Sequence, residues 1–92
     1  MEARFCQYIH KNVGQIFYTV TDLPFTYELR KKGLYISRVR DDGEHTFTYE
    51  NLQKAFSLMP MKTVGELKSK GITGSSYCFA IIQEFYKEEN LR

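Results

Sequence analysis

The sequence predicts a small α+β domain, in which an antiparallel meander of three or four strands has two or three helices packed on one face. Two observations predict this class. Apolar and polar residues alternate between positions 15 and 47, as in half-buried strands, and apolar residues return every third or fourth position between 49 and 88, as in helices. A chain of 92 residues is expected to form a single domain, because it is too short for a second core.

The first element is a helix expected over residues 2–12. Phe5, Tyr8 and Ile9 follow the helical spacing of three and four, and would face the core. Gly14 is typical of the position just after a helix ends.

A strand is expected next, over residues 15–21. Alternation places Phe17 and Thr19 on one of its faces. The opposite face would carry Ile16, Tyr18 and Val20. We interpret Phe17 and Tyr35 as facing away from that second group, where they would be open to a partner.

Two further strands are expected over residues 25–30 and 34–40. The turn between them is Lys31-Lys32-Gly33, in which the glycine allows a positive φ. The first of these strands alternates cleanly. Its inward side chains would be Phe25, Tyr27 and Leu29, and its outward ones Thr26, Glu28 and Arg30.

The strand over residues 34–40 is less regular. Tyr35 and Val39 belong to its outward face, but Arg38 and Arg40 share the parity of the inward Leu34. Either the inward face runs past the core at this point, or a bulge changes the register.

A turn at Asp42-Gly43 predicts a short fourth strand over residues 44–47. The period then changes to that of helices. Thr48 is a suitable N-cap for a helix over residues 49–59, which Pro60 would end.

Two more helices are expected after Pro60. Thr63 and Glu66 form a capping box that opens a short helix, and Gly71 closes it. A last helix is expected over residues 77–87, although the run SSYCFAII is also compatible with a buried strand.

The composition limits the class of protein. The net charge is only +2, so any binding of nucleic acid would be local. Cys6 and Cys78 cannot build the disulfide framework of a small secreted domain, which favours a reducing, cytoplasmic location. We expect a soluble chain with no membrane partner, because no apolar run approaches the roughly 18 residues of a membrane span.

Residues 30–40 contain five of the thirteen Lys and Arg residues and no acid. This cationic strip consists of Arg30, Lys31, Lys32, Arg38 and Arg40. Since it coincides with a predicted hairpin, it would offer a docking surface for phosphates, and aromatics such as Tyr27 and Tyr35 between cations are typical of surfaces on which bases stack. The alternative is a solvated edge that prevents aggregation, with the arginines paired to Asp41, Asp42 or Glu44.

Ser75 and Ser76 follow Gly74 at the expected start of the last helix. Backbone N–H groups at a helix start, with two hydroxyls beside them, can bind an anion. A serine at this position also caps a helix without any ligand.

Residues 63–86 resemble a helix-turn-helix motif. Gly71-Ile72-Thr73 would be the turn, Ser76-Tyr77 would open the second helix, and Ile81 would be a core position. The resemblance implies that the second helix enters the major groove of DNA. Because Leu67 stands where the motif usually has a small residue, two core helices joined by a glycine turn remain the alternative.

The order helix, three strands, helix is also similar to that of double-stranded RNA-binding domains. Residues 75–82 lack the basic residues that begin the last helix of that family, so we carry none of its binding residues over.

Few residues suggest catalysis or metal binding. Cys6 and His10 lie four residues apart on one helical face, as in a thiolate–imidazole pair or two metal ligands. A zinc site needs three or four ligands, and His45 lies in a predicted turn. We therefore expect no catalytic residue, no metal site and no cofactor, and we do not expect an enzyme.

The hypothesis that the sequence favours is a small non-enzymatic nucleic-acid-binding module. The cationic strip would neutralise phosphates, and Ser75 and Ser76 would donate hydrogen bonds from a helix start. The alternative is a protein-interaction module, such as an adaptor, a subunit or an inhibitor of a larger machine, and possibly a homodimer. Seven Tyr and seven Phe residues support this alternative, because aromatic residues are enriched at interfaces.

Overall fold

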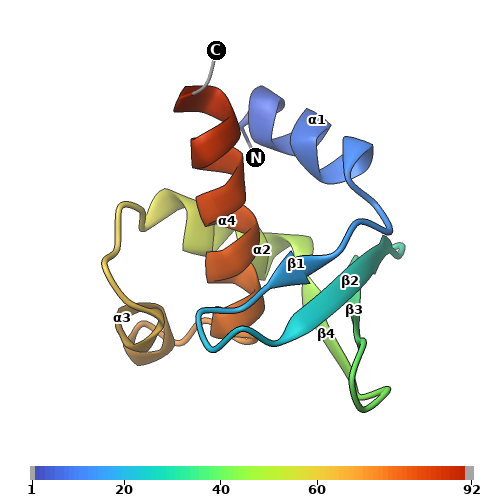
Figure 1. Ribbon diagram of the computed structural model, residues 1–92. Helices are drawn as coiled ribbons and strands as arrows, with labels where there is room; N and C mark the ends of the chain where they lie inside the picture. The colour runs from blue at the N-terminus through green and yellow to red at the C-terminus, as the bar shows by residue number, and fades with distance from the viewer. Residues whose placement is uncertain (1, 91–92) are drawn as a thin grey trace.

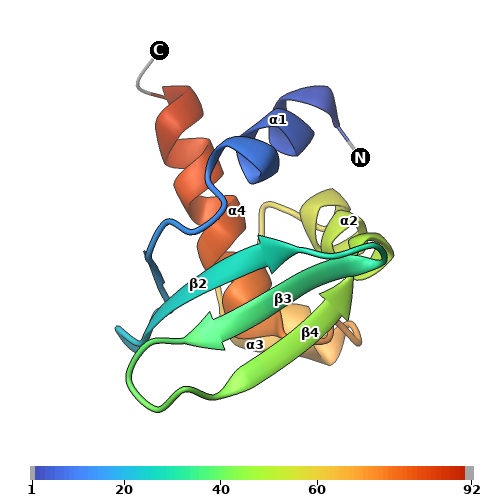
Figure 2. The same ribbon diagram turned by 90° about the vertical axis from the view of Figure 1, so that its right-hand side faces the viewer.

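The computed structural model describes residues 2–90, which form one four-stranded antiparallel sheet and four helices. The predicted α+β class and the meander are confirmed. The strands are β1 (Phe17–Tyr18), β2 (Pro24–Leu29), β3 (Gly33–Arg38) and β4 (Glu44–Thr48), paired in that order. The helices are α1 (Ala3–Lys11), α2 (Tyr49–Ser57), α3 (Val64–Ser69) and α4 (Ser75–Asn90). In Figures 1 and 2 the helices gather on one face of the sheet, and none of the described helices covers the other face.

β1 is much shorter than the strand predicted over residues 15–21, because a tight loop follows it. The Thr19 N–H donates to the Leu23 carbonyl at 3.1 Å, and the Asp22 N–H donates to the Thr19 carbonyl at 2.8 Å. Asp22 closes the loop with a φ of 66°, a left-handed conformation that Asp tolerates. The loop therefore begins only one residue beyond β1.

The alternation along β1 was predicted correctly, but our interpretation of which face is open was wrong. Phe17 is 5% exposed and its ring stacks on that of Phe25, with 5.9 Å between the centroids. The exposed side chains are those of Ile16, Tyr18 and Val20. The inner face of the sheet has room for a large aromatic at this edge, and burying Phe17 there removes more apolar area from water than burying Ile16 would.

The register between β2 and β3 explains why an arginine has inward parity. Phe25 pairs with Arg38, and Tyr27 pairs with Ile36. Phe25, Tyr27 and Ile36 are fully buried, whereas Arg38 lies at the end of this face and is partly exposed. The inward face runs past the core, and the pairing is continuous across β2 and β3 without a bulge.

Gly33 is required for a reason other than the one we predicted. It begins β3 without a positive φ, and it pairs with Thr48. A Cβ atom at this position would overlap the Phe47 carbonyl and would lie 2.6 Å from the Thr48 Cα. Glycine is therefore needed for the close approach of β4.

The helix caps agree with the sequence patterns. The Thr48 hydroxyl accepts a hydrogen bond from the Asn51 N–H at 3.0 Å, and the Thr63 hydroxyl accepts one from the Glu66 N–H at 3.3 Å. Residues 75–90 form a helix, so the alternative of a buried strand is wrong. Other boundaries lie within three residues of the predicted ones, as is usual at element ends.

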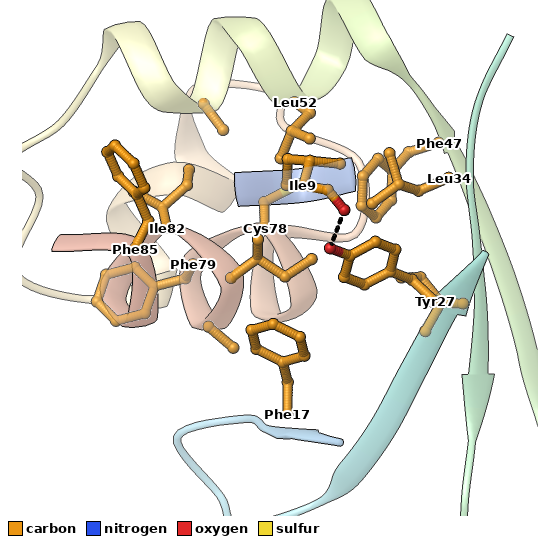
Figure 3. Packing of buried hydrophobic residues seen from close by; sticks show 14 of the residues in the cluster. Ile9, Phe17, Tyr27, Leu34, Phe47, Leu52, Cys78, Phe79, Ile82 and Phe85 are labelled. Carbon is orange, nitrogen blue, oxygen red and sulfur yellow. Dashed lines mark hydrogen bonds between the residues drawn. The ribbon is translucent and has the colours of Figure 1, made fainter. Parts of the chain in front are cut away.

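The core lies between α4 and the inner face of the sheet. Figure 3 shows Cys78 and Ile82 of α4 among side chains from the strands and from α2. The Tyr27 hydroxyl donates a hydrogen bond to the Ile9 carbonyl and so joins α1 to the sheet. Burial raises the pKa of Tyr27 above its ordinary value and raises the pKa of Tyr8 to about 12.

Candidate interaction surface

The cationic strip is divided between the two ends of β3. Arg30, Lys31 and Lys32 surround the turn that precedes Gly33, whereas Arg38 ends the strand and Arg40 follows it. Five residue steps along a strand measure about 17 Å. The predicted strip is therefore divided into two groups of cations, one at each end of β3.

Arg30 is engaged by its neighbours on the outer face. Its Nη2 lies 3.1 Å from a carboxylate oxygen of Glu28, and its guanidinium carbon lies 4.4 Å from the centre of the Tyr35 ring. Both Arg30 and Glu28 are well exposed, so the ion pair is solvated and weak. The carboxylate nevertheless compensates the charge of Arg30 locally.

Arg38 supports the loop between β3 and β4. Its Nε lies 3.0 Å from Asp41 Oδ1, but the geometry is that of an ionic contact without an aligned hydrogen bond. The same Asp41 oxygen accepts the Gly43 N–H at 3.0 Å, and the guanidinium packs against Gly43. Pairing of Arg38 with Asp41 was one of the two possibilities that the sequence left open.

Acidic residues occupy the outer face between the two groups of cations. Glu28 stands opposite Tyr35, and Glu44 stands opposite Ser37. A hydrogen bond to Glu44 is the main reason why the pKa of Tyr35 lies above its ordinary value. The stretch of sequence without acids becomes a mixed surface once the neighbouring strands are in place.

Lys31, Lys32 and Arg40 keep their charge open to solvent. All three are exposed, and none forms an ion pair within residues 2–90. They lie at opposite ends of β3, with the lysines at one end and Arg40 at the other.

The two predicted serines lie on the covered side of the sheet. Ser75 is 8% exposed and Ser76 is half-buried. The preceding Gly74 packs against His45 and Phe47, which point inward from β4. The sheet therefore separates Ser75 and Ser76 from Tyr35 on its outer face. The structure does not bring the two serines together with the cationic strip.

The segment that resembles a helix-turn-helix motif belongs largely to the core. Residues 78–82 of α4 are buried one after another, and Leu67 of α3 is fully buried. The N-terminal half of α4 packs against the sheet, so it does not present a free face for a DNA groove. This arrangement corresponds to two core helices joined by a glycine turn.

Exposed apolar side chains gather at the corner of the sheet formed by β1, its hairpin loop and the end of β3. Within residues 2–90 seven large apolar residues are more than a third exposed. Four of them fall in residues 16–23, which span β1, the residue before it and its hairpin loop, and a fifth directly follows β3. We call these five the apolar corner: Ile16, Tyr18, Val20, Leu23 and Val39.

The strand register places three side chains of this region in one row. Tyr18 pairs with Pro24, and the Val39 N–H donates to the Pro24 carbonyl at 3.1 Å, which continues the β2–β3 register by one pair. Phe17 and Phe25 point inward, so Tyr18, Pro24 and Val39 point outward together. Tyr18 is 57% exposed and Val39 is 49% exposed.

A small hollow borders this row. It is lined by Leu23, Pro24, Arg38, Arg40 and Asp41. The second group of cations therefore lies at the rim of the apolar corner, where an apolar centre meets a charged edge.

The residues considered for catalysis are held by local contacts. Cys6 Sγ lies 3.8 Å from His10 Nδ1, as the helical spacing predicts, but this nitrogen also lies 2.9 Å from the Cys6 carbonyl oxygen. Burial raises the pKa of Cys78 to about 12, which keeps it a thiol at neutral pH. The described residues contain no group of three potential metal ligands.

Sequence reasoning missed the apolar corner because it assigned the wrong face of β1 to the partner. One usable signal was the outward parity of Val39, which the sequence showed. The other was Pro24, whose missing N–H suits the end of a strand beside a short neighbour. Neither signal reveals that Tyr18 and Val39 meet across β2, because that depends on the register.

Among residues 2–90 no helix combines the length and the apolar character needed to cross a membrane. No family model, curated protein or solved structure matches this chain.

Proposed function

We propose that this chain is a protein-interaction module that binds a partner through the apolar corner. The row formed by Tyr18, Pro24 and Val39 carries the proposal, because it places the exposed Tyr18 and Val39 on either side of the half-buried Pro24. Contiguous apolar patches on a small domain are typical of interaction sites. An exposed tyrosine in the row with Arg40 at the rim is the composition of an interface hot spot.

The charges of the outer face favour a protein partner over a nucleic acid. A phosphate backbone is bound best by cations without competing carboxylates. Here Glu28 and Glu44 stand between the cations, and Arg30 and Arg38 each have an acidic partner. A protein surface can accommodate such a mixture of charges, because its own charges are also mixed.

Site-specific photo-crosslinking tests the proposal. A benzoylphenylalanine at position 18, in cells that express the chain, is expected to yield discrete protein adducts. The same probe at Thr46, which is exposed on the opposite edge of the sheet, is the matched control. Val39→Asp should remove the adducts at position 18, because it places a charge within the apolar row. Equal adducts from both positions, or adducts that survive Val39→Asp, would contradict the proposal.

A nucleic-acid-binding module is the second candidate function. The observation that favours it is the exposure of Lys31, Lys32 and Arg40 without ion pairs in the described chain. In this candidate the three residues contact phosphates, together with Arg30 and Arg38 where their acidic partners release them. Ser75 takes no part because it is buried.

Fluorescence anisotropy with duplex and single-stranded oligonucleotides tests this second candidate. Binding through Lys31 and Lys32 predicts that Lys31→Glu/Lys32→Glu abolishes the signal and that affinity falls steeply with salt. Lys68→Glu/Lys70→Glu is the control, because it makes the same change of charge on and just after α3. If both double variants lose affinity equally, the binding is a general response to net charge and the candidate is wrong.

A further inference from the structure

The open edge of β1 has unpaired backbone groups. In an antiparallel pair, successive residues direct their N–H and C=O groups alternately toward the neighbouring strand and away from it. The Thr19 N–H donates to Leu23 of the β1–β2 hairpin, and Phe17 pairs with Phe25 in the same phase. The N–H and C=O groups of Ile16 and Tyr18 therefore point away from β2.

The surface beside this edge is hollowed. Two hollows lie between β1 and α4, and Tyr18, Glu84 and Lys87 line both of them. Figure 1 looks toward this edge, with β1 in front of the other strands and α4 running beside it. No other part of the described chain is drawn in front of β1.

The edge lacks the features that normally prevent strand addition. Residues 15–21 carry no charge, in a chain of which 26% of the residues are charged. Proline and charged side chains are the usual protection of an open edge. The sequence pattern is that of a seven-residue strand, yet β1 comprises only Phe17 and Tyr18. The segment therefore has a greater tendency to form a strand than its pairing with β2 uses.

We infer that the occupant of this edge is a second copy of the chain, whose β1 pairs antiparallel with the first. This inference rests on the proposed function and names its partner. A two-fold axis at Phe17 places Ile16 of each copy opposite Tyr18 of the other, so that exposed apolar side chains meet in both directions. The backbone groups of these same residues then form the ladder, and the two sheets become one.

The charges near the axis are compatible with a second copy. Glu84 and Lys87, which line both hollows, form an ion pair of 3.2 Å and have no net charge together. Glu88, which lines one hollow, is paired with Lys11 at 3.5 Å. Two identical surfaces therefore meet without a net repulsion, which an unbalanced edge would impose on a homodimer.

Sedimentation and amide hydrogen exchange of the whole chain, both as a function of concentration, test this inference. A dimer is expected, and the amides of Ile16 and Tyr18 should exchange more slowly as it forms. The amides of Phe17 and Thr19 serve as internal controls, because they face β2 in the monomer and in the dimer. This alternating protection is specific to β1 pairing and requires no substitution.

A matched pair of variants completes the test. Tyr18→Lys should raise the dimer Kd by about tenfold or more, because it places a charge opposite an apolar residue twice in the dimer. Thr46→Lys adds the same charge to the outer face of β4 and should leave the Kd unchanged. Circular dichroism of both variants confirms that each one is folded.

Two results would overturn the inference. A dimer without alternating protection at residues 16–19 would use another surface, and a chain that stays monomeric at every concentration would have no such partner. In either case protein adducts at position 18 that are lost in Val39→Asp would still support the proposed function, with a different protein as the occupant.

Discussion

The two edge strands of the sheet, β1 and β4, differ in how readily they would pair with a further strand. β4 carries the charged Glu44 and the polar Thr46 on its outer face, and the chain enters α2 directly after Thr48. β1 carries the exposed Tyr18 and is directly preceded by the exposed Ile16, and residues 15–21 contain no charge. Charge and an adjoining helix keep an edge from pairing. β4 therefore terminates the sheet, whereas β1 keeps the unpaired backbone groups and the exposed apolar side chains that a further strand would require.

The strongest test of this comparison separates the two faces of β1. Phe17→Ala removes a buried ring from the core and should lower the free energy of unfolding by about 3–5 kcal/mol. Tyr18→Ala is the control, and as an exposed position it should change stability by only about 0.5 kcal/mol. Urea unfolding followed by circular dichroism measures both. Similar losses for the two variants would mean that the inward and outward faces are assigned incorrectly.

A second test concerns the closer packing at the β4 side. Gly33→Ala would force its Cβ into the Phe47 carbonyl, which is backbone and cannot rotate away, so we expect a loss of about 1–3 kcal/mol. The same substitution at Gly65 of α3 meets only the Thr63 hydroxyl at 3.8 Å. It should stabilise the protein by up to about 1 kcal/mol, because alanine is the better helix former. A neutral Gly33→Ala in thermal unfolding would show that β3 and β4 are not so tightly joined.

A third test uses pH to weaken the contacts that join Tyr27 of β2 to α1 and to the segment before β1. The Tyr27 hydroxyl donates to the Ile9 carbonyl, and the Tyr27 carbonyl accepts the Gly14 N–H at 3.2 Å. The pKa of Tyr27 is raised by burial, and that of Tyr8 is raised to about 12 by burial and by Glu84 and Glu88. Both phenols are therefore neutral in the folded state at pH values where they ionise in the unfolded chain.

The sign of the pH dependence follows from these shifts. The contribution of each phenol to stability is complete below about pH 10, the ordinary value, and is lost as the pH rises through the folded pKa. Unfolding by urea at pH 8 and pH 11 should show this loss. Tyr27→Phe should cost about 1 kcal/mol at pH 8 and show a smaller further loss at pH 11. An equal loss in the variant would mean that Tyr27 does not contribute to the alkaline sensitivity.

The sequence predicted the elements well because each one has a local signal. Thr48 and Thr63 are caps, Gly71 follows a helix, and alternation marks β2. The inward parity of Arg38 was also recognised, since parity depends only on position along one strand. These features are decided by residues within a few positions of one another.

The candidate site could not be predicted in the same way, because it depends on contacts across strands. The cationic strip contains no acid along the chain, but β2 brings Glu28 and β4 brings Glu44 beside it. Which face of β1 turns inward depends on the space beside Phe25 and Tyr27. The Phe17 ring packs against both of these residues and is buried, whereas Tyr18 is exposed. Ser75 looked available at a helix start, but the way α4 packs on the sheet buries it.

The smallest expected effect on stability comes from the acids of the outer face. Glu28→Gln/Glu44→Gln removes two exposed carboxylates, one of which pairs with Arg30 at 3.1 Å, and should change the free energy of unfolding by less than about 1 kcal/mol. The same double variant should lower the pKa of Tyr35, because the Glu44 carboxylate is replaced by a neutral amide, a weaker acceptor, and the two negative charges that also raise this pKa are removed. A tyrosine titration by NMR checks this shift.

In the oligonucleotide assay the same double variant distinguishes the cationic strip from the apolar corner as the binding surface. If phosphates bind the cations at the ends of β3, removing the neighbouring carboxylates should raise the affinity for oligonucleotides. An interaction confined to the apolar corner should be unaffected, since Tyr18 and Val39 keep all their neighbours.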